Sequence, residues 1–316
     1  MAKKLAVIGG IAAGMSAAAK ARRIDRDLEI VVFTDETRVS YGACGLPYYI
    51  SGEIKKASHL VARTIEQFKE QGIKVRTQCR VEEIRPATRS LLIRSFKTGD
   101  HYEYEYDSLV IATGASARIP PIANADLNGV FKLRNVEDGE DIRQYLAEAK
   151  PQNAVIVGGG YIGLEMAEVL HQQGIKVAIV EMAPHLAPNM DRDMAEILQQ
   201  YLQEQGIEVF TGEKVLALEG DAPTASANRT RVRQLVTDCR TLPADLVLLS
   251  AGVTPNSWLA GKAGLALGAQ QAIRVNERME TSEPGIYAAG DCATTFHLVT
   301  GEEVYIPMGT TANKQG

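Results

Sequence analysis

A single cysteine in the stretch SYGACGLPYYISG (40–52) is the residue of this sequence best suited to thiol chemistry. Pro47 suits the first turn of a helix through YYIS, which would put Cys44 at or just before the helix N-terminus. The helix dipole favours a thiolate there, although a free cysteine is more commonly a small buried hydrophobe. The nearest other cysteine, Cys79, lies a whole element away, so a disulfide reaction would need a second sulfur from a substrate.

The segment GGGYIG (158–163) matches the glycine fingerprint of a dinucleotide-binding turn. Gly158 permits the tight turn, Gly160 lets a pyrophosphate approach the backbone, and Gly163 packs helix on strand. Phosphates then lie at the helix N-terminus, where free N–H groups attract anions. Glu181 ends the next strand, where a carboxylate accepts hydrogen bonds from a ribose diol and repels a 2′-phosphate. We therefore predict a site that favours NADH over NADPH; the alternative is a glycine turn that merely packs.

A second glycine loop, GGIAAG (9–14), departs from this pattern. Gly9 and Gly14 are present, but Ile11 stands where the second glycine belongs. The motif also expects an acidic residue at the end of the next strand, but here Thr34 ends the strand and Asp35 comes one residue later. By itself this loop is equally compatible with a dinucleotide site and with a packing turn.

Two further segments favour a second ligand site. LVIATGASA (109–117) and GIYAAGDCA (285–293) are strands that end in small residues, followed by a turn. Small residues let the backbone come close to a bulky ligand, and Asp291 would hydrogen-bond a polyol chain. Each segment alone is equally compatible with a core strand and its tight turn.

These motifs need parallel sheets to position them. Segments 5–23 and 154–174 each read as strand, glycine turn and Ala-rich helix, and each leads to a second apolar strand, 28–33 or 176–181. This order predicts two βαβ units and an α/β fold. The other predicted features are an antiparallel hairpin about Thr98–Gly99–Asp100, short antiparallel strands over 215–249 with a polar loop at 221–230, and a domain boundary at the Pro-rich 119–125.

The composition narrows the class of protein. The 316 residues suffice for two domains, and a 45% hydrophobic, 23% charged chain is typical of globular proteins. A net charge of -5 argues against nucleic-acid and anionic-membrane partners. Four cysteines without CxxC, and five histidines without ligand spacing, predict neither a disulfide framework nor a metal site, and favour a reducing, cytoplasmic compartment. The N-terminal MAKKLAVIGGIAAGMSAAAKA has the outline of a secretory signal, but strand, turn and helix explain it better.

The two glycine loops, ATG at 112–114, SAGVTPN at 250–256 and IYAAGDCA at 286–293 together resemble the FAD-dependent pyridine nucleotide–disulfide oxidoreductases, over the whole chain and in the right order. The resemblance implies two Rossmann-like dinucleotide-binding domains, the second inserted in the first. The implied bounds are 1–118 and 255–316 for the FAD domain and 119–254 for the NAD(P)H domain. It also implies that a C-terminal dimerisation domain is absent from this chain and that the full-length protein is a homodimer.

The same resemblance implies site residues. Those for FAD are Gly9, Ile11, Ala12, Ala13, Gly14, Thr34, Asp35, Val81, Thr113, Gly114, Gly290 and Asp291. Those for NAD(P)H are Gly158, Gly160, Tyr161, Ile162, Gly163, Glu165, Glu181 and Gly252, with the Tyr161 position over the flavin and the Glu165 position near the nicotinamide.

Within the family, VSYGACGLPYY, the AAG loop and KARR look most like the single-cysteine branch, and within it the coenzyme A disulfide reductases. Branch members that reduce peroxide or oxygen usually carry a histidine in the first loop, where this chain has Ala12. The hypothesis is a resting Cys44 in mixed disulfide with coenzyme A. Electrons from NADH, passed through FAD, reduce this disulfide, and the freed Cys44 thiolate attacks an incoming CoA disulfide.

Coenzyme A is anionic, so its site needs positive charge. Ser16, Lys20 and Arg23 share one face of the first helix, whereas Ala17, Ala21 and Ile24 form a face suited to the core. The resemblance implies CoA contacts for the first three residues and for Ser40, with Lys314 a further candidate; the alternative is a solvated basic face. Cys79 and Cys239 are predicted to be packing residues, and Cys292 to have no chemistry.

Three functions remain open at this point. The first is an NAD(P)H-dependent reductase of CoA disulfide or CoA persulfide. The second is an NADH oxidase or peroxidase that cycles Cys44 through a sulfenic acid. The third is a catalytically idle flavoprotein that binds NADH to sense redox state or to hold a partner.

Overall fold

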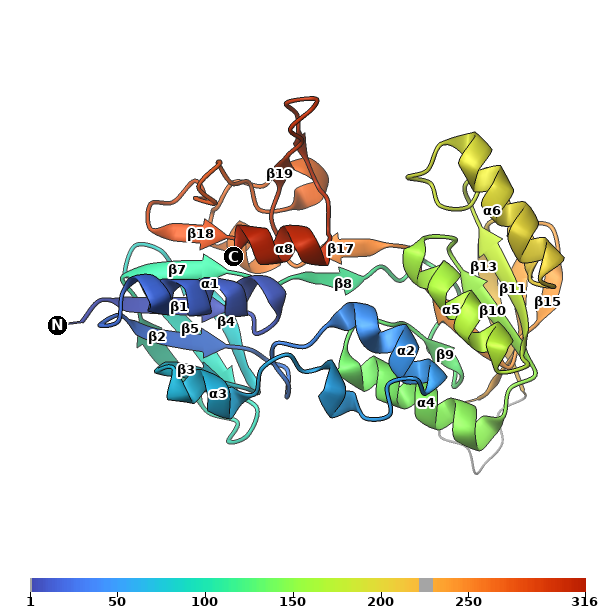
Figure 1. Cartoon of the computed structure of the whole chain (residues 1–316), viewed down its shortest axis with the longest axis horizontal. Helices are drawn as coiled ribbons and strands as arrows, with labels where there is room; N and C mark the ends of the chain where they lie inside the picture. The colour runs from blue at the N-terminus through green and yellow to red at the C-terminus, as the bar shows by residue number, and fades with distance from the viewer. Residues whose placement is uncertain (1, 222–229) are drawn as a thin grey trace. The chain divides into compact units, whose positions relative to one another are not determined.

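The structure, a computed structural model, describes residues 2–221 and 230–316 (Figure 1). Most of the predicted polar loop at 221–230 lies outside the described residues. The chain forms two compact units. Unit 1 comprises 1–42, 61–116 and 254–316, and unit 2 comprises 43–60 and 117–253. The predicted domain bounds, which stay a prediction, differ from these units mainly in the segment 43–60, which carries Cys44.

Unit 1 is built on a parallel sheet of strand order β18-β7-β1-β2-β3, with α1 running between β1 and β2 as the βαβ prediction requires. A three-stranded antiparallel sheet, β4-β5-β6, contains the predicted hairpin. The elements are β1 (Lys4–Ile8), α1 (Ala12–Ile24), β2 (Glu29–Phe33), α3 (Ile65–Glu70), β3 (Ile73–Arg76), β4 (Cys79–Arg85), β5 (Ser90–Ser95), β6 (His101–Glu105), β7 (Ser108–Ile111), α7 (Trp258–Lys262), η3 (Ala269–Gln271), β18 (Ile286–Ala288), β19 (Thr295–Phe296), β20 (Glu303–Val304) and α8 (Gly309–Gln315).

Unit 2 is built on a second parallel sheet, of order β12-β11-β10-β16-β9. The elements are η1 (Ala43–Gly45), α2 (Leu46–Ser51), η2 (Ala57–Leu60), β9 (Val130–Phe131), α4 (Val136–Ala149), β10 (Asn153–Val157), α5 (Tyr161–Gln172), β11 (Lys176–Glu181), α6 (Arg192–Glu204), β12 (Glu208–Thr211), β13 (Val215–Gly220), β14 (Val232–Thr237), β15 (Thr241–Pro243) and β16 (Leu246–Leu249). The short strands β8 (Ala115–Ala117) and β17 (Val253–Pro255) pair with each other where the chain passes between units.

The prediction of short antiparallel strands over 215–249 is confirmed for β13, β14 and β15 but is wrong for the last strand. β16 is fully buried and runs parallel to β10 in the main sheet. The reason lies in its composition: LVLL is a continuous apolar run, which suits a strand covered on both faces rather than one that alternates.

Each unit has its own core. In unit 1 the residues of β1 and β2 pack on Met15 and Ala18 of α1 and on Phe68 of α3. In unit 2 the residues of β10, β11 and β16 pack against β13 and β14. Among the described residues, no helix is long and apolar enough to cross a membrane.

Candidate functional site

The loop Gly158–Gly163 connects β10 to α5 at the carboxyl edge of the second sheet. Gly158 has φ +109°, and its N–H donates to the Val180 carbonyl over 2.8 Å. A Cβ on Gly158 would lie 2.5 Å from the Ser250 oxygen, and one on Gly163 would lie 2.1 Å from the Gly158 oxygen. Both positions therefore require glycine, for the turn and for the close packing of helix on strand.

Gly160 differs from these two glycines. It precedes the first residue of α5 in extended conformation, and a Cβ there would meet nothing within 4 Å. The open space in front of a helix N-terminus is the place where a pyrophosphate binds in this type of loop. The residues present therefore fit a dinucleotide.

Glu181 lies at the end of β11 beside this loop. Its Oε2 accepts the Gly159 N–H and its Oε1 accepts the Ala183 N–H, each over 2.7 Å. The two backbone donors orient the carboxylate, and each oxygen keeps a further lone pair for a ribose hydroxyl.

The remaining residues predicted for NAD(P)H gather at the same sheet edge. Tyr161 and Ile162 begin α5, and the Tyr161 side chain is 53% exposed. Glu165 follows one turn later; loss of hydration raises the pKa of this carboxyl, and repulsion by Glu168 adds to the shift. Gly252, with φ +91°, follows β16, the strand beside β10.

The first loop in unit 1 has the same backbone geometry despite its departures in sequence. Gly9 has φ +114° and donates its N–H to the Phe33 carbonyl over 2.8 Å. A Cβ on Gly9 would lie 2.0 Å from the Ala112 oxygen, and one on Gly14 would lie 2.0 Å from the Gly9 oxygen. Ile11 precedes α1, in which Ala12 is the first residue and Ala13 is buried. The structure thus makes this loop a counterpart of the Gly158–Gly163 turn.

Two other predicted segments meet this loop at the carboxyl ends of β7 and β18. Thr113 donates its hydroxyl to the Asn256 carbonyl over 2.7 Å, and Gly114 has φ +66°. Gly290, with φ +82°, comes so close to α1 that a Cβ would lie 2.9 Å from Ala13 Cβ. Asp291 follows directly. The small residues therefore bring three backbone segments together at one edge of the sheet.

The acidic position of the first loop differs from that of the second. The Thr34 side chain lies against Gly10, as Glu181 lies against Gly159. The Asp35 carboxylate instead accepts two hydrogen bonds from Arg80, of 2.9 and 3.1 Å. The Val81 side chain is buried in the core, so only its backbone is available to a ligand.

Four of the predicted substrate residues lie on two adjoining helices of unit 1, α1 and α8 (Figure 1). Ser16 donates its hydroxyl to Asn313 over 3.1 Å, next to Lys314. Lys20 and Arg23 are exposed farther along α1. Ser40 has φ +51° and donates its N–H to the Gly10 carbonyl over 2.8 Å, beside the glycine loop.

The prediction that Ala17, Ala21 and Ile24 form the core face of α1 was wrong, since Ala17 and Ala21 are only half-buried. Ile24 is 75% exposed because the helix ends there, and the buried residues are instead Ala13, Gly14, Met15 and Ala18. Arg22 covers the end of the helix: its guanidinium donates to the carbonyls of Arg26, Leu28 and Gly72.

Cys44 lies in unit 2, in the 3₁₀ turn η1 immediately before α2. The predicted helix is confirmed, with Pro47 in its first turn. The thiol is exposed, and α2 packs on α4 and α5, the helix that begins at the Gly158–Gly163 loop. The reading of Cys44 as a small buried hydrophobe is therefore wrong.

The other three cysteines differ from Cys44 in their surroundings. Cys79 and Cys292 are buried, and burial raises the pKa of the Cys292 thiol. Cys239 is exposed, so its predicted packing role is wrong; it lies in the turn between β14 and β15, where little covers it. All four cysteines, which lie within the described part of the chain, are free.

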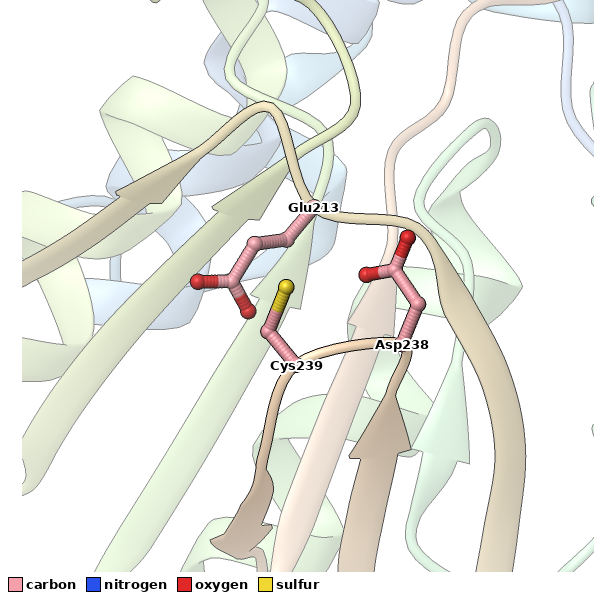
Figure 2. A group of neighbouring side chains, drawn as sticks. All are labelled: Glu213, Asp238 and Cys239. Atoms are coloured by element: carbon pink, nitrogen blue, oxygen red, sulfur yellow. The ribbon is translucent and has the colours of Figure 1, made fainter.

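Glu213, Asp238 and Cys239 form a group with metal-ligand spacing (Figure 2). The charge of the Glu213 carboxylate is already balanced by Arg240, with which it forms a 2.8 Å ion pair. The carboxylate also accepts hydrogen bonds from Thr237 and Arg240. Loss of hydration, and then the two neighbouring carboxylates, raise the pKa of Cys239, which keeps the thiol protonated. The group is a polar turn with a satisfied ion pair.

Sequence reasoning assigned no role to several residues that shape these loops. The Ser250 hydroxyl donates to the carbonyl of Gly158 over 3.0 Å. The Gln315 side chain accepts the Gly290 N–H over 2.8 Å. Arg143 of α4 contacts the segment that follows Cys44. SAGVTPN contained a signal for Ser250, whereas nothing local marked Gln315 or Arg143.

Two glycine loops, each between a buried strand and a helix at the carboxyl edge of its own parallel sheet, define a protein with two dinucleotide sites. A family model described as pyridine nucleotide-disulphide oxidoreductase matches residues 3–316. The chain therefore belongs to this family of enzymes, as the sequence resemblance predicted. The family implies FAD and NAD(P)H as cofactors, and both loops have the backbone geometry of a dinucleotide-binding turn.

Several relatives match over nearly the whole chain. An NADH oxidase of Methanocaldococcus jannaschii is 40% identical over 98% of this chain and 67% of its own length. An NAD(P)H coenzyme A polysulfide/persulfide reductase of Pyrococcus horikoshii is 36% identical over 100% of this chain and 68% of its own. A coenzyme A disulfide reductase of Staphylococcus epidermidis is 28% identical over 98% of this chain and 68% of its own length.

Among solved structures, reduced CoADR-RHD of Bacillus anthracis superposes with a TM-score of 0.94 at 35% identity. The match covers 100% of this chain and 55% of that one. The chain thus spans about two thirds of the length of the curated relatives and just over half of this structure.

Proposed function

We propose that this chain is the nucleotide-binding part of an NAD(P)H-dependent flavoprotein that reduces coenzyme A disulfide or coenzyme A persulfide through Cys44. The observation that carries the proposal is the position of Cys44. It is an exposed thiol at the start of α2, in the same compact unit as the Gly158–Gly163 loop, and it forms no disulfide. The relatives named for coenzyme A persulfide and disulfide reduction support the substrate class.

The proposed assignment of cofactors follows the two loops. The Gly9–Gly14 loop, with Thr113, Gly114, Gly290 and Asp291, would hold FAD, and the Gly158–Gly163 loop would hold the nicotinamide dinucleotide. The Glu181 carboxylate, held by two backbone donors at the end of β11, supports NADH as the preferred form, because a carboxylate at this position of the motif would repel a 2′-phosphate. Bound FAD would supply the path by which two electrons of NADH reach a disulfide.

The thiol chemistry at Cys44 balances with one protein sulfur. In the resting state Cys44 forms a mixed disulfide with coenzyme A. Two electrons and one proton cleave that S–S bond, leaving the Cys44 thiolate and free coenzyme A thiol. The thiolate then attacks a CoA disulfide, forms a new Cys44–CoA bond and expels coenzyme A thiolate, which takes a second proton. The net reaction consumes NADH, one proton and one CoA disulfide.

An NADH oxidase or peroxidase is the second candidate. The relative that is 40% identical carries the name NADH oxidase, and an exposed thiol without a partner cysteine also suits a sulfenic acid cycle. Ala12 at the start of α1 argues against it, since the resembling peroxide and oxygen reducers usually carry a histidine at that position.

The mass of the Cys44 peptide from non-reduced protein distinguishes the two candidates. We expect an adduct with the mass of coenzyme A that dithiothreitol removes, together with NADH oxidation that depends on added CoA disulfide. One added oxygen on Cys44, with NADH oxidation that depends on O₂ alone, would favour the oxidase or peroxidase. An unmodified thiol and no NADH oxidation by either acceptor would refute both candidates and leave a binding protein.

A further inference from the structure

A single arginine of unit 2 holds the segment that carries Cys44. The Arg143 side chain of α4 directs Nη1 to three main-chain carbonyls, those of Tyr49, Ile54 and Lys55, at 3.3, 3.5 and 3.2 Å. The guanidinium also lies over the Tyr49 ring, with 4.7 Å between its carbon and the ring centroid. Both contacts are to the chain that follows Cys44.

One of the three carbonyls, that of Tyr49, belongs to the last turn of α2, and those of Ile54 and Lys55 belong to the segment that follows the helix. α2 has six residues and ends at Gly52, whose N–H returns to the Tyr49 carbonyl. A cation at the C-terminus of a helix interacts favourably with the negative end of the dipole. Because one nitrogen serves three oxygens, each distance is long, and the attraction is that of a charge for three converging dipoles.

The packing around Arg143 fixes α2 at a short distance from α4. Gly139 lies one turn before Arg143, and a Cβ there would lie 3.1 Å from Leu46 Cδ2, at the start of α2. At the other end of α2, the Gln173 side chain after α5 donates to the Ile50 carbonyl over 3.5 Å. Figure 1 shows α2 beside α4. Thus both ends of α2 are held by helices of unit 2.

We propose that Arg143 is a positioning residue for Cys44, fastening the thiol segment to the body of the NAD(P)H-binding unit. It does not touch the sulfur. Arg143 acts through α2. While Arg143 holds this helix, the thiol keeps a fixed place at the helix N-terminus, next to the positive end of the helix dipole. Release of the helix would remove both the fixed place and the dipole. The proposal deepens the proposed function and rests on it only for the identity of the substrate.

The test compares three variants in the FAD-loaded protein. Arg143→Ala removes the charge and the stacking, and Arg143→Lys keeps the charge but loses the planar guanidinium. Gln144→Ala is the matched control, because the exposed Gln144 is the next residue of α4 and, among the described residues, its side chain donates to Glu148 of the same helix. Hydrogen exchange of the amides of 46–55 reports the helix, and that of β10 and β11 reports whether unit 2 is folded.

We expect Arg143→Ala to speed exchange over 46–55 about tenfold while β10 and β11 stay protected, with Arg143→Lys intermediate and Gln144→Ala unchanged. Iodoacetamide should label Cys44 roughly twofold to fivefold more slowly relative to Cys239, an exposed thiol in the same unit that serves as internal reference. In steady state, kcat for disulfide reduction should fall while KM for NADH does not change.

Unchanged exchange over 46–55 in Arg143→Ala would overturn the proposal. So would faster exchange accompanied by unchanged labelling of Cys44 and unchanged kcat, since Arg143 would then only stabilise the helix. If β10 and β11 also lose protection in Arg143→Ala, the Arg143→Lys variant decides by the same criteria. Hydrogen exchange and iodoacetamide labelling do not require coenzyme A. These two measurements therefore still test the role of Arg143 if the substrate is not a coenzyme A disulfide or persulfide.

Discussion

Cys44 differs from the other cysteines in its surroundings. Two of the others are buried, and loss of hydration, with the neighbouring carboxylates, raises the pKa of the Cys239 thiol. Only Cys44 is exposed at the start of a helix. The reactivity of a thiol depends on such surroundings, because the thiolate is the nucleophile.

Cys44→Ser should therefore abolish reduction of CoA disulfide, by at least about a thousandfold in kcat, because serine cannot form a disulfide. FAD content and the bleaching of the flavin by NADH should not change. Steady-state rates and the visible spectrum measure these quantities. Cys239→Ser is the matched control with full activity, and disulfide reduction that survives in Cys44→Ser would disprove the role of this thiol.

Glu181 is the residue expected to choose between nicotinamide nucleotides. Glu181→Ala should raise KM for NADH about tenfold, since ribose loses a charged acceptor, and should lower KM for NADPH by removing repulsion. Glu204→Ala, at the exposed end of α6, is a control of equal charge change. If the variant and the wild type have the same KM for NADH and also the same KM for NADPH, this carboxylate does not face the 2′ position.

Among secondary-structure elements, two glycines of the second loop, Gly160 and Gly163, have separable roles. Gly163 packs α5 against the turn, whereas Gly160 faces open space. The same division explains how the first loop keeps its geometry with Ile11 in place of a glycine. Gly9 and Gly14 are the residues whose Cβ would strike the backbone, and both are present.

Gly160→Ala should fold normally yet bind NADH at least tenfold more weakly, because the added methyl fills the space for the pyrophosphate. Gly163→Ala should instead lower the melting temperature, since its Cβ would lie 2.1 Å from a carbonyl oxygen. Thermal unfolding and NADH titration of both variants measure the two effects. A lower melting temperature for Gly160→Ala would contradict the division.

On the scale of the whole molecule, the predicted site residues are divided between two compact units. Unit 1 contains the Gly9–Gly14 loop and the predicted coenzyme A residues, and unit 2 contains the Gly158–Gly163 loop and Cys44. The segment 43–60 leaves unit 1 after Gly42 and returns at Val61, where an antiparallel bridge joins Tyr41 to Val61. The thiol thus belongs to unit 2, although the chain before and after the segment 43–60 belongs to unit 1.

Hydrogen exchange with each nucleotide tests the assignment of the loops. Adding FAD to the flavin-free protein should slow exchange in 5–14, 109–114 and 286–291, because bound ligand stabilises the native contacts. Adding NADH should slow exchange in 155–165 and 180–184. ADP-ribose, which lacks the nicotinamide, serves as a control for the second loop. Protection of the first loop by NADH alone would reverse the proposed assignment.

The sequence by itself determined both βαβ units, the two glycine loops and the helix after Cys44. These features depend on local rules: apolar strands, glycines where a Cβ would strike backbone, and proline in a first turn. Family membership followed from the order of the same motifs along the whole chain.

Tertiary structure alone decided the rest. The exposure of Cys44 and Cys239, the parallel course of β16, and the attachment of 43–60 to unit 2 all depend on residues distant in sequence. Arg143 lies about 90 residues from the carbonyls it holds. No local pattern encodes such a contact, because burial and long-range charge–dipole attraction exist only once the chain has folded.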